Sequence, residues 1–482
     1  MSDPTHAVPA LPEHLPPDAR AHDPLAVALG NASLLAVGYL MLRRWGLAVV
    51  AVVVTVVLVS MVVSTARSSY EVLVLVWWAA VVAHGWFLAR GGARGAGRGA
   101  VRGRRLVALC ITLPVLLAVG LLRFDASRIE GDVNEARADG DCAEAVSAQD
   151  RVWFGHRVAD APLTARGDEV VEACDRLRTA RTELATALTG DNGALRDGFG
   201  TLGSVLAESG NEKTVETTLN GFLRGLPAKD PCDTVTITDW LQDRTRSHDV
   251  LDRSADTAKR TEPAALVACG DDLMAHSSWE SARTHYERLL DRYPDDSLAA
   301  KARTGVRKAT QSIELANVRS LLAGDTGSQP EYCSKPAKYS GAKPMGKGTN
   351  RALFYGDDDT YGGGYTGKLP GSWKSDDPAD AVLVVCMGTE GFGTSVETCP
   401  YRDRDSGSLT YVSFHKIAIP VKVYELRTGK LVAKRKIQIS GSSCPSVISY
   451  FTYGDSGTPP STRYVTESKS DVRNAFRPLV TR

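Results

Sequence analysis

Four long apolar runs fill the first quarter of this chain, and none of them contains Asp, Glu, Lys or Arg. They cover residues 25–42, 46–63, 72–89 and 106–122. Each is close to the roughly 20 residues that an α-helix needs to cross about 30 Å of hydrocarbon. The pattern predicts an α-helical transmembrane bundle of four spans over residues 25–123, preceded by a disordered, proline-rich tail over residues 1–24.

The loop between the third and fourth runs predicts the orientation of the spans. It carries six arginines: Arg90, Arg94, Arg98, Arg102, Arg104 and Arg105. Short arginine-rich loops stay in the cytoplasm, so these residues determine the topology and residues 124–482 are expected to be extracytoplasmic. Four spans also place the amino terminus outside. We therefore expect a multi-pass protein of the cell membrane with both termini extracytoplasmic.

The first apolar run is the weakest, because Gly30, Asn31, Ser33 and Gly38 interrupt it. If it does not span the membrane, the amino terminus moves inside while the carboxyl-terminal region stays outside. His84 is the ionisable residue within the third run. We interpret it as a snorkelling or helix–helix hydrogen-bonding residue, because the spans offer no carboxylate as a proton-relay partner.

Residues 124–325 have apolar positions three and four residues apart, which predicts helices. The clearest helix covers residues 279–290, and a second begins near residue 295. Ala282, Tyr286 and Pro294 stand where the tetratricopeptide family has a small residue, an aromatic residue and a closing proline. This pair of helices therefore resembles one tetratricopeptide unit.

Two other segments, residues 140–146 and 210–227, begin 70 residues apart. That interval is close to two repeats of about 34 residues, so we expect an extracytoplasmic tetratricopeptide-like α-solenoid. An irregular helical bundle is the alternative. Either architecture leaves apolar grooves suited to a peptide or a partner helix.

Residues 326–482 are predicted to form a β-rich, disulfide-bonded α+β domain. Residues 380–386 form a compact apolar strand, residues 413–440 a hairpin, and residues 471–476 a short amphipathic helix.

The register of the hairpin follows from its apolar faces. A three-residue loop with Gly429 in the left-handed conformation aligns the apolar residues of both strands. The expected pairs are Leu426 with Lys430, Val423 with Ala433, Ile419 with Ile437 and Ile417 with Ile439. Pro420 cannot donate a ladder hydrogen bond, so we expect its strand at an edge or at a bulge.

Charge and length narrow the possible functions. Residues 1–123 carry eleven arginines against five acidic residues, and the whole chain is +1, so residues 124–482 carry a net charge of −5. A basic nucleic-acid-binding surface is not indicated, and we expect no nucleic-acid partner. The region after the spans is long enough for two domains with their own cores.

Eight of the nine cysteines follow the spans, while Cys110 lies within the fourth run. An even number confined to the extracytoplasmic part predicts structural disulfides. Metal binding needs closely spaced cysteine pairs, which this chain does not have. The sequential pairing is a guess that favours bonds within domains: Cys142 with Cys174, Cys232 with Cys269, Cys333 with Cys386 and Cys399 with Cys444.

Three segments imitate functional motifs without their necessary context. Residues 341–348 resemble a phosphate loop, but a glycine replaces the Ser or Thr that holds magnesium and no strand precedes. Residues 454–457 match the tetrapeptide around a trypsin-like nucleophile, here Ser456 with His415 as candidate base, but the domain is too small for two six-stranded barrels. Residues 357–359 begin an acidic run without calcium-ligand spacing. We assign no catalytic, cofactor-binding or metal-binding residue and expect no cofactor.

The preference for arginine over lysine, the Ala- and Val-rich spans and residues 23–33 resemble an uncharacterised actinobacterial family of multi-pass membrane proteins. The terminal domain also resembles a recurring envelope module of unknown activity. That second resemblance is carried by residues 369–373, 382–386, 399–401, 426–430 and 444–445. Neither resemblance implies a function or functional residues.

These observations favour a bacterial cell-envelope interaction or scaffold protein that binds a protein or cell-wall partner and is not an enzyme. A cell-envelope hydrolase that uses the carboxyl-terminal domain is one alternative. A sensor or transporter accessory subunit is the other.

Overall fold

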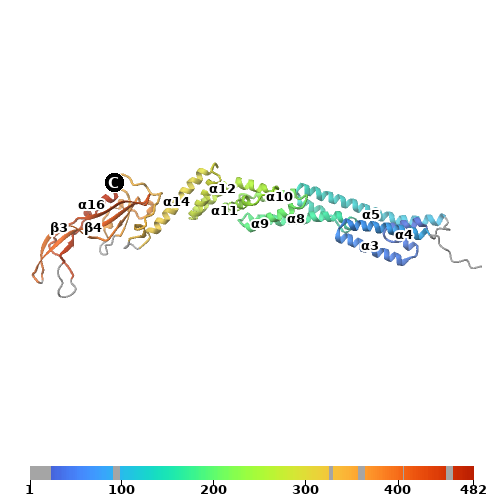
Figure 1. Cartoon of the computed structure of the whole chain (residues 1–482), viewed down its shortest axis with the longest axis horizontal. Coiled ribbons are helices and arrows are strands. Elements are labelled where there is room, and N and C mark those ends of the chain that lie inside the picture. Colours follow the sequence, from blue (N-terminus) through green and yellow to red (C-terminus); the bar gives the residue numbers. More distant parts are fainter. Residues whose placement is uncertain are drawn as a thin grey trace, which may run out of the picture. The chain divides into compact units, whose positions relative to one another are not determined.

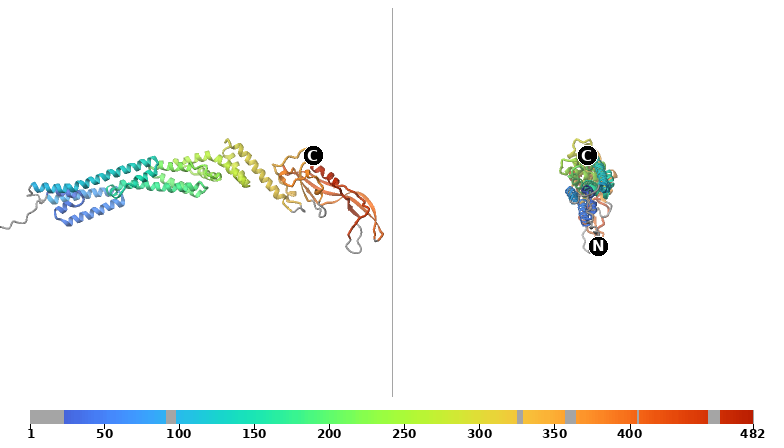
Figure 2. Two further views of the ribbon diagram at one scale, coloured as in Figure 1. Left: turned by 180° about the vertical axis from the view of Figure 1, so that it is seen from behind. Right: turned by 90° about the vertical axis from the view of Figure 1, so that its right-hand side faces the viewer.

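The computed structural model describes residues 23–90, 98–324, 329–356, 364–404, 406–451 and 460–481. The chain divides into two compact units, Met1–Thr261 and Glu262–Arg482, within helix α12. The described elements up to Leu322 are helices, and the strands begin at Ala352. Figure 1 and Figure 2 show this change, from the helices coloured blue to yellow to the strands coloured orange. The predicted succession of a helical and a β-rich region is therefore present.

Three helices in the described part of the chain are long and apolar enough to cross a membrane. They are α3 (Trp45–Thr65), α4 (Ser68–Arg90) and the segment Arg105–Asp139 of α5 (Arg98–Asp139). Most of their valine and leucine side chains are exposed, as lipid contact requires. Helix α5 has 42 residues and continues beyond its apolar part into the helical region, where it packs against α6 and α8.

The prediction of four spans is wrong at the first run. Residues 25–42 form two short helices, α1 (Pro24–Ala32) and α2 (Val37–Met41), of nine and five residues. At about 1.5 Å per residue, α1 is roughly 14 Å long and covers less than half of the hydrocarbon thickness. The two helices form a hairpin, and α1 packs against both α4 and α5.

The residues that weaken the first run also close this hairpin. A Cβ atom on Gly38 would lie 2.1 Å from the carbonyl oxygen of Val27, so only glycine permits this approach of α2 to α1. Asn31 is fully buried; its side chain accepts a hydrogen bond from the Tyr39 amide and donates one to the Val81 carbonyl, both at 3.2 Å. The Tyr39 hydroxyl lies 2.8 Å from His84 Nδ1. His84 therefore makes the helix–helix contact that was expected of it.

The rest of the first unit is a set of helices, most of which share one apolar core. They are α6 (Cys142–Gln149), α7 (Phe154–Ala159), α8 (Ala161–Ala187), α9 (Asn192–Leu206), α10 (Glu212–Leu223), α11 (Pro231–Asp243) and the first turns of α12 (Arg253–Ala275), with the 3₁₀ turn η1 (Val250–Asp252). Residues Leu184, Leu195, Leu202 and Leu219 are buried in this core.

The second unit begins with the remainder of α12, followed by α13 (Trp279–Arg292) and α14 (Ala299–Leu322). The helix pair expected around residues 279–290 and 295 onward is therefore confirmed. Tyr286 fills the space between Gly270 and Gly305, since a Cβ atom on either glycine would lie 2.6 Å from its ring. The tetratricopeptide resemblance itself stays a prediction.

The carboxyl-terminal sheet has six strands among the described residues: β1 (Ala352–Tyr355), β2 (Leu383–Met387), β3 (Gly391–Arg402), β4 (Leu409–Glu425), β5 (Lys430–Ile439) and β6 (Thr462–Tyr464). The long strand β4 is central: β2 and β3 pair with one side of it, and β5 and β6 with the other. Strand β1 pairs in parallel with β2. Short helical turns η2 (Glu331–Cys333), α15 (Gly364–Gly367), η3 (Gly371–Trp373) and η4 (Pro378–Asp380) lie in the connections.

Both faces of this sheet are covered. Helix α16 (Lys469–Val480), which contains the helix predicted at residues 471–476, packs on one face with Val472 and Phe476. On the other face, Val318 and Leu322 of α14 pack with Tyr332 and Val384. Strand β2 is buried on both faces, as its continuous apolar run predicts.

The predicted hairpin register is confirmed over most of its length. Strands β4 and β5 pair Ile417 with Ile439, Ile419 with Ile437 and Val423 with Ala433, and Gly429 has a φ of 67°. Near the turn a register shift pairs Lys430 with Glu425 rather than Leu426.

The expectation of an edge strand or a bulge at Pro420 is wrong, because β4 is central and the register shift in its pairing with β5 lies between Val423 and Tyr424. Pro420 is tolerated because its backbone faces the gap between β2 and β3, where its carbonyl accepts a hydrogen bond from Gly388 and no ladder bond needs its missing N–H.

Candidate binding groove along helix α10

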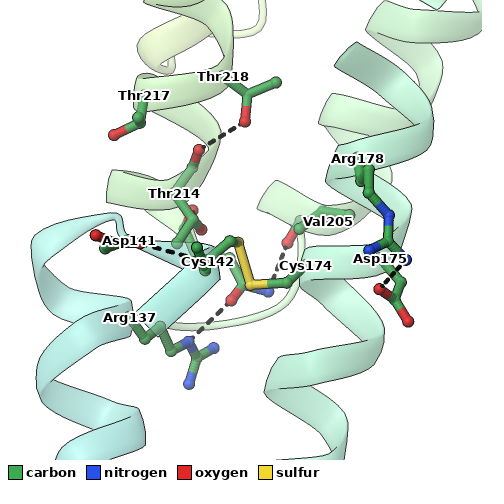
Figure 3. The surroundings of a disulfide bond; sticks show 12 residues. Arg137, Asp141, Cys142, Cys174, Asp175, Arg178, Val205, Thr214, Thr217 and Thr218 are labelled. Atoms are coloured by element: carbon green, nitrogen blue, oxygen red, sulfur yellow. Dashed lines mark hydrogen bonds and ion pairs between the residues drawn. A yellow bond between two sulfur atoms is a disulfide. The ribbon is translucent and has the colours of Figure 1, made fainter. Parts of the chain in front are cut away.

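A cavity of about 750 Å³ opens between helices α6, α8 and α10 of the first unit. Its lining comes from three segments: Asp139, Gly140, Asp141, Cys142, Ala143 and Val146; Cys174, Asp175, Leu177, Arg178 and Arg181; and Thr214, Thr217, Thr218, Gly221 and Arg224. Figure 3 shows the disulfide between Cys142 and Cys174 together with the threonines of α10.

The turn from α5 to α6 forms one end of this cavity. Gly140 has a φ of 79°, and a Cβ atom there would lie 2.5 Å from Thr217 Oγ1, so the close approach of this turn to α10 requires glycine. Asp141 then caps α6 by accepting hydrogen bonds from the amides of Ala143 and Glu144, both at 3.0 Å. Cys142, the first residue of α6, is bonded to Cys174 of α8 with a Cα–Cα distance of 5.4 Å.

Asn211 fixes the start of α10 against two other helices. Its side chain is buried, accepts a hydrogen bond from Arg137 Nε at 2.8 Å and donates one to the Val205 carbonyl at 3.2 Å. Arg137 and Val205 are labelled in Figure 3. The amino-terminal turn of α10 is thereby held against both α5 and α9.

The threonines of α10 give the groove a wall of hydrogen-bond acceptors. The hydroxyls of Thr214, Thr217 and Thr218 donate to carbonyl oxygens of Asn211, Lys213 and Thr214 on their own helix, at 2.7, 2.9 and 3.0 Å. Their protons are thus engaged, and the oxygen lone pairs and methyl groups remain for a ligand.

Arginines from two helices line the groove, since Arg178 and Arg181 lie on α8 and Arg224 is the residue that ends α10. Arg178 is paired with Asp175 at 2.7 Å. Arg181 and Arg224 also line the cavity, and no ion pair of either side chain is found within the part of the chain that the structure describes. Asp139 and Asp141 line the cavity as well, so its charged side chains are of both signs. A carboxylate of a ligand could pair with Arg181 or Arg224.

A second cavity of about 580 Å³ extends the groove toward α12. It is lined by Thr217, Asn220, Leu223, Arg224, Thr257 and Arg260. Thr217 and Arg224 border both cavities, so the two form one continuous depression along α10. A groove that follows a whole helix fits an extended chain better than a small molecule.

The lining of the groove does not suggest covalent chemistry. It contains no histidine and no serine, and its cysteines are joined in a disulfide. His156, the histidine nearest to it in sequence, is buried and its Nε2 lies 3.0 Å from Asp125. The arrangement is suited to binding.

The structure joins the cysteines in four disulfides. Cys142 is bonded to Cys174, Cys333 to Cys386 and Cys399 to Cys444, which are the sequential pairs, and Cys232 and Cys269 are also disulfide-bonded. Cys110 is free and exposed on α5. Glu397 lies close to the sulfurs of Cys399 and Cys444, but disulfide sulfurs carry no thiolate for a metal ion.

The imitated motifs have ordinary structural roles where they are described. The phosphate-loop-like residues 341–348 precede a strand and not a helix, and Asn350 ties them down by accepting from the Gly346 amide at 2.8 Å. His415 on β4 donates from Nδ1 to the Gly393 carbonyl at 3.1 Å. Residues 357–359 and 454–457, with Ser456, lie outside the described residues.

The arginines that predict the topology are described in part. Arg90 is the last residue of α4, and Arg105 pairs with Asp23 at the start of the α1–α2 hairpin. Arg98, Arg102 and Arg104 belong to α5, and Arg94 lies outside the described residues.

Comparisons with protein families, with curated proteins and with solved structures found no match to this chain. The role of the groove must therefore be inferred from its own residues.

Sequence reasoning anticipated grooves between the helices but not these residues. The usable local signals were Gly140-Asp141 and Gly210-Asn211, each of which precedes a helix. They predict helix starts, and of the two pairs Gly140-Asp141 lines the groove while Asn211 anchors the start of α10.

Proposed function

We propose that this chain is a membrane-anchored extracytoplasmic interaction protein whose groove along α10 binds an extended, carboxylate-bearing segment of a protein or cell-wall partner. The observation that carries the proposal is the groove along α10, which Arg181 of α8 and Arg224 at the end of α10 line together with the threonine acceptors. Such a lining recognises a chain by charge and hydrogen bonds.

The placement of the groove outside the cell is supported by two independent features. Arginine-rich segments at residues 43–44 and 90–105 flank the apolar spans on one side, which favours the cytoplasm for that side. The disulfides beyond the spans favour an oxidising compartment for the other side. With three spans, the amino terminus and the α1–α2 hairpin belong to the cytoplasmic side. This placement replaces the expectation from four spans that both termini lie outside.

This placement is tested by labelling intact cells with a membrane-impermeant maleimide, before and after reduction. We expect mass tags without cell lysis, and only after reduction. Free thiols that become accessible only on lysis would refute the placement.

The groove is tested by fluorescence anisotropy on the full-length protein in nanodiscs. The probes are two labelled peptides of equal length, one alternating Glu and Ala and the other alternating Gln and Ala. We expect the Glu peptide to bind more tightly, with an affinity that falls as salt is added and that falls at least tenfold in Arg181→Gln and Arg224→Gln.

Arg196→Gln is the matched control, because Arg196 is an exposed arginine of the neighbouring helix α9 outside both cavities. Equal binding of the two peptides would refute the proposal. So would an equal loss of affinity in the groove variants and in the control.

A further inference from the structure

Three large apolar side chains are exposed in the helical region beyond the spans, and they lie together. Trp153 is 58%, Phe154 70% and Val158 37% exposed, on α7 and the residue before it. Among the described residues from 125 to 324, these are the exposed large apolar side chains. Such a concentration on an otherwise polar surface marks a contact site.

Helix α7 lies at the end of the spans where α3 leads into α4. It packs against α3, α5 and α8. His156 Nε2 lies 3.0 Å from Asp125 of α5. At the end of α7, Asp160 lies 3.2 Å from Arg123, whose guanidinium also pairs with Glu71 in the first turn of α4 at 2.9 Å.

The length of α5 gives the depth of this point in a bilayer. From Arg105 to Phe124 the helix rises by roughly 28 Å at about 1.5 Å per residue, which matches the hydrocarbon thickness of about 30 Å. With Arg105 at the cytoplasmic boundary, Phe124 and the neighbouring α7 fall at the opposite boundary. Phe124 is itself 62% exposed, with the Arg128 guanidinium 5.9 Å from its ring centre.

The Trp153 side chain is fixed on the surface by its surroundings. The Trp153 amide donates to His156 Nδ1 at 3.3 Å, and the Trp153 ring packs edge to face with the imidazole at 5.7 Å between centres. A Cβ atom on Gly155 would lie 2.5 Å from the indole, so the ring lies directly against the backbone of α7. These contacts prevent Trp153 from entering the core.

We propose that Trp153, Phe154 and Val158 insert into the headgroup region of the outer leaflet and fix the helical region at the membrane surface. Amphipathic aromatic rings are favoured at this boundary. The inference rests on α3, α4 and α5 spanning the bilayer, and it adds a lipid contact to the proposed function.

The test measures the depth of a nitroxide label in the full-length protein in phosphatidylcholine nanodiscs. Three single-thiol proteins are compared: Phe154→Cys and Thr182→Cys, each with Cys110→Ser, and the unchanged chain labelled at Cys110. Thr182 is an exposed residue of α8 and serves as the aqueous control, while Cys110 is exposed on the span of α5. Relaxation of the label by oxygen and by a water-soluble nickel chelate reports its depth.

We expect the oxygen-to-nickel ratio at residue 154 to exceed that at residue 182 several-fold and to lie below that at Cys110. An aqueous ratio at residue 154 with a membrane ratio at Cys110 would overturn this inference alone. A label at residue 154 shielded from both reagents would also overturn it, because a protein surface would then cover the site. An aqueous ratio at Cys110 would overturn the membrane placement together with this inference.

Discussion

Removal of the Cys142–Cys174 disulfide should loosen the groove along α10 before it affects the rest of the protein. The bond closes a loop with a sequence separation of 32. In the chain-entropy model, closing a loop of this length lowers the entropy of the unfolded chain by about 12 cal/mol/K. This corresponds to a stabilisation of the folded state by about 3.7 kcal/mol at 25 °C. Helix α6 has only eight residues, so apart from the Asp141 cap it depends on packing and on this bond.

The assay is hydrogen exchange of the full-length protein, read by mass spectrometry on peptides from α6, α8 and α10. We expect Cys142→Ala combined with Cys174→Ala to increase exchange in α6 by up to several hundredfold, since about 1.4 kcal/mol corresponds to a factor of ten. Exchange in β2 and β4, which belong to the other unit, should be unchanged.

The matched control is Cys399→Ala combined with Cys444→Ala, which removes a bond of similar separation, 45, from the carboxyl-terminal domain. It should increase exchange near β3 and leave α6 protected. Unchanged exchange in α6 after removal of the first bond would refute the reasoning, and so would equal effects of the two double variants on α6.

Gly38→Leu should open the α1–α2 hairpin, because any Cβ atom there meets the Val27 carbonyl; proteolysis of the amino-terminal region would show increased cleavage. Glu262→Gln should destabilise the helices α12 and α13 by about 3 kcal/mol, since this fully buried carboxylate is paired with arginines of α13; the denaturant midpoint of the second unit measures the loss. Burial opposes ionisation of Glu314, but hydrogen bonds from the loop at residues 338–340 outweigh it and lower its pKa, while an amide and a guanidinium lower the pKa of Asp377. Both carboxyl groups therefore have a lower pKa in the folded than in the unfolded state. Their contribution to the stability of α14 is present above about pH 4.5 and is lost as the pH falls through the folded-state pKa values. Hydrogen exchange in α14, measured as a function of pH, would follow this loss.

The hairpin of β4 and β5 shows how far local patterns determine register. The alternation of Ile417, Ile419, Ile437 and Ile439 fixes which faces coincide, because a shift by one residue would turn every one of them to the opposite face. The position of Pro420 could not be predicted in the same way. It depends on where β2 ends and β3 begins, and those strands pair with β4 through contacts that its own sequence does not encode.

The groove is beyond local prediction for a related reason. Gly140, Cys174 and Thr217 come from the α5–α6 turn, from α8 and from α10, and each has an ordinary local role in a turn, a disulfide or a helix surface. They line one groove only because α6, α8 and α10 pack together. The even number of cysteines after the spans could predict disulfides because each bond requires two cysteines. A groove lined by threonines and arginines has no comparable requirement in the sequence.

The first apolar run illustrates the limit of hydropathy. Its length and composition satisfy the criterion for a span, yet Gly38 permits a close helix crossing and Asn31 supplies the hydrogen bonds of a tight turn. In a low-dielectric environment, an amide that can pair with Tyr39 and Val81 inside a hairpin is more stable than one facing lipid in a straight helix. Those partners come from α2 and α4, so the choice between a span and a hairpin depends on neighbours that a window of 18 residues does not contain. The number of spans, and with it the side of the amino terminus, is therefore decided by tertiary packing rather than by hydrophobicity.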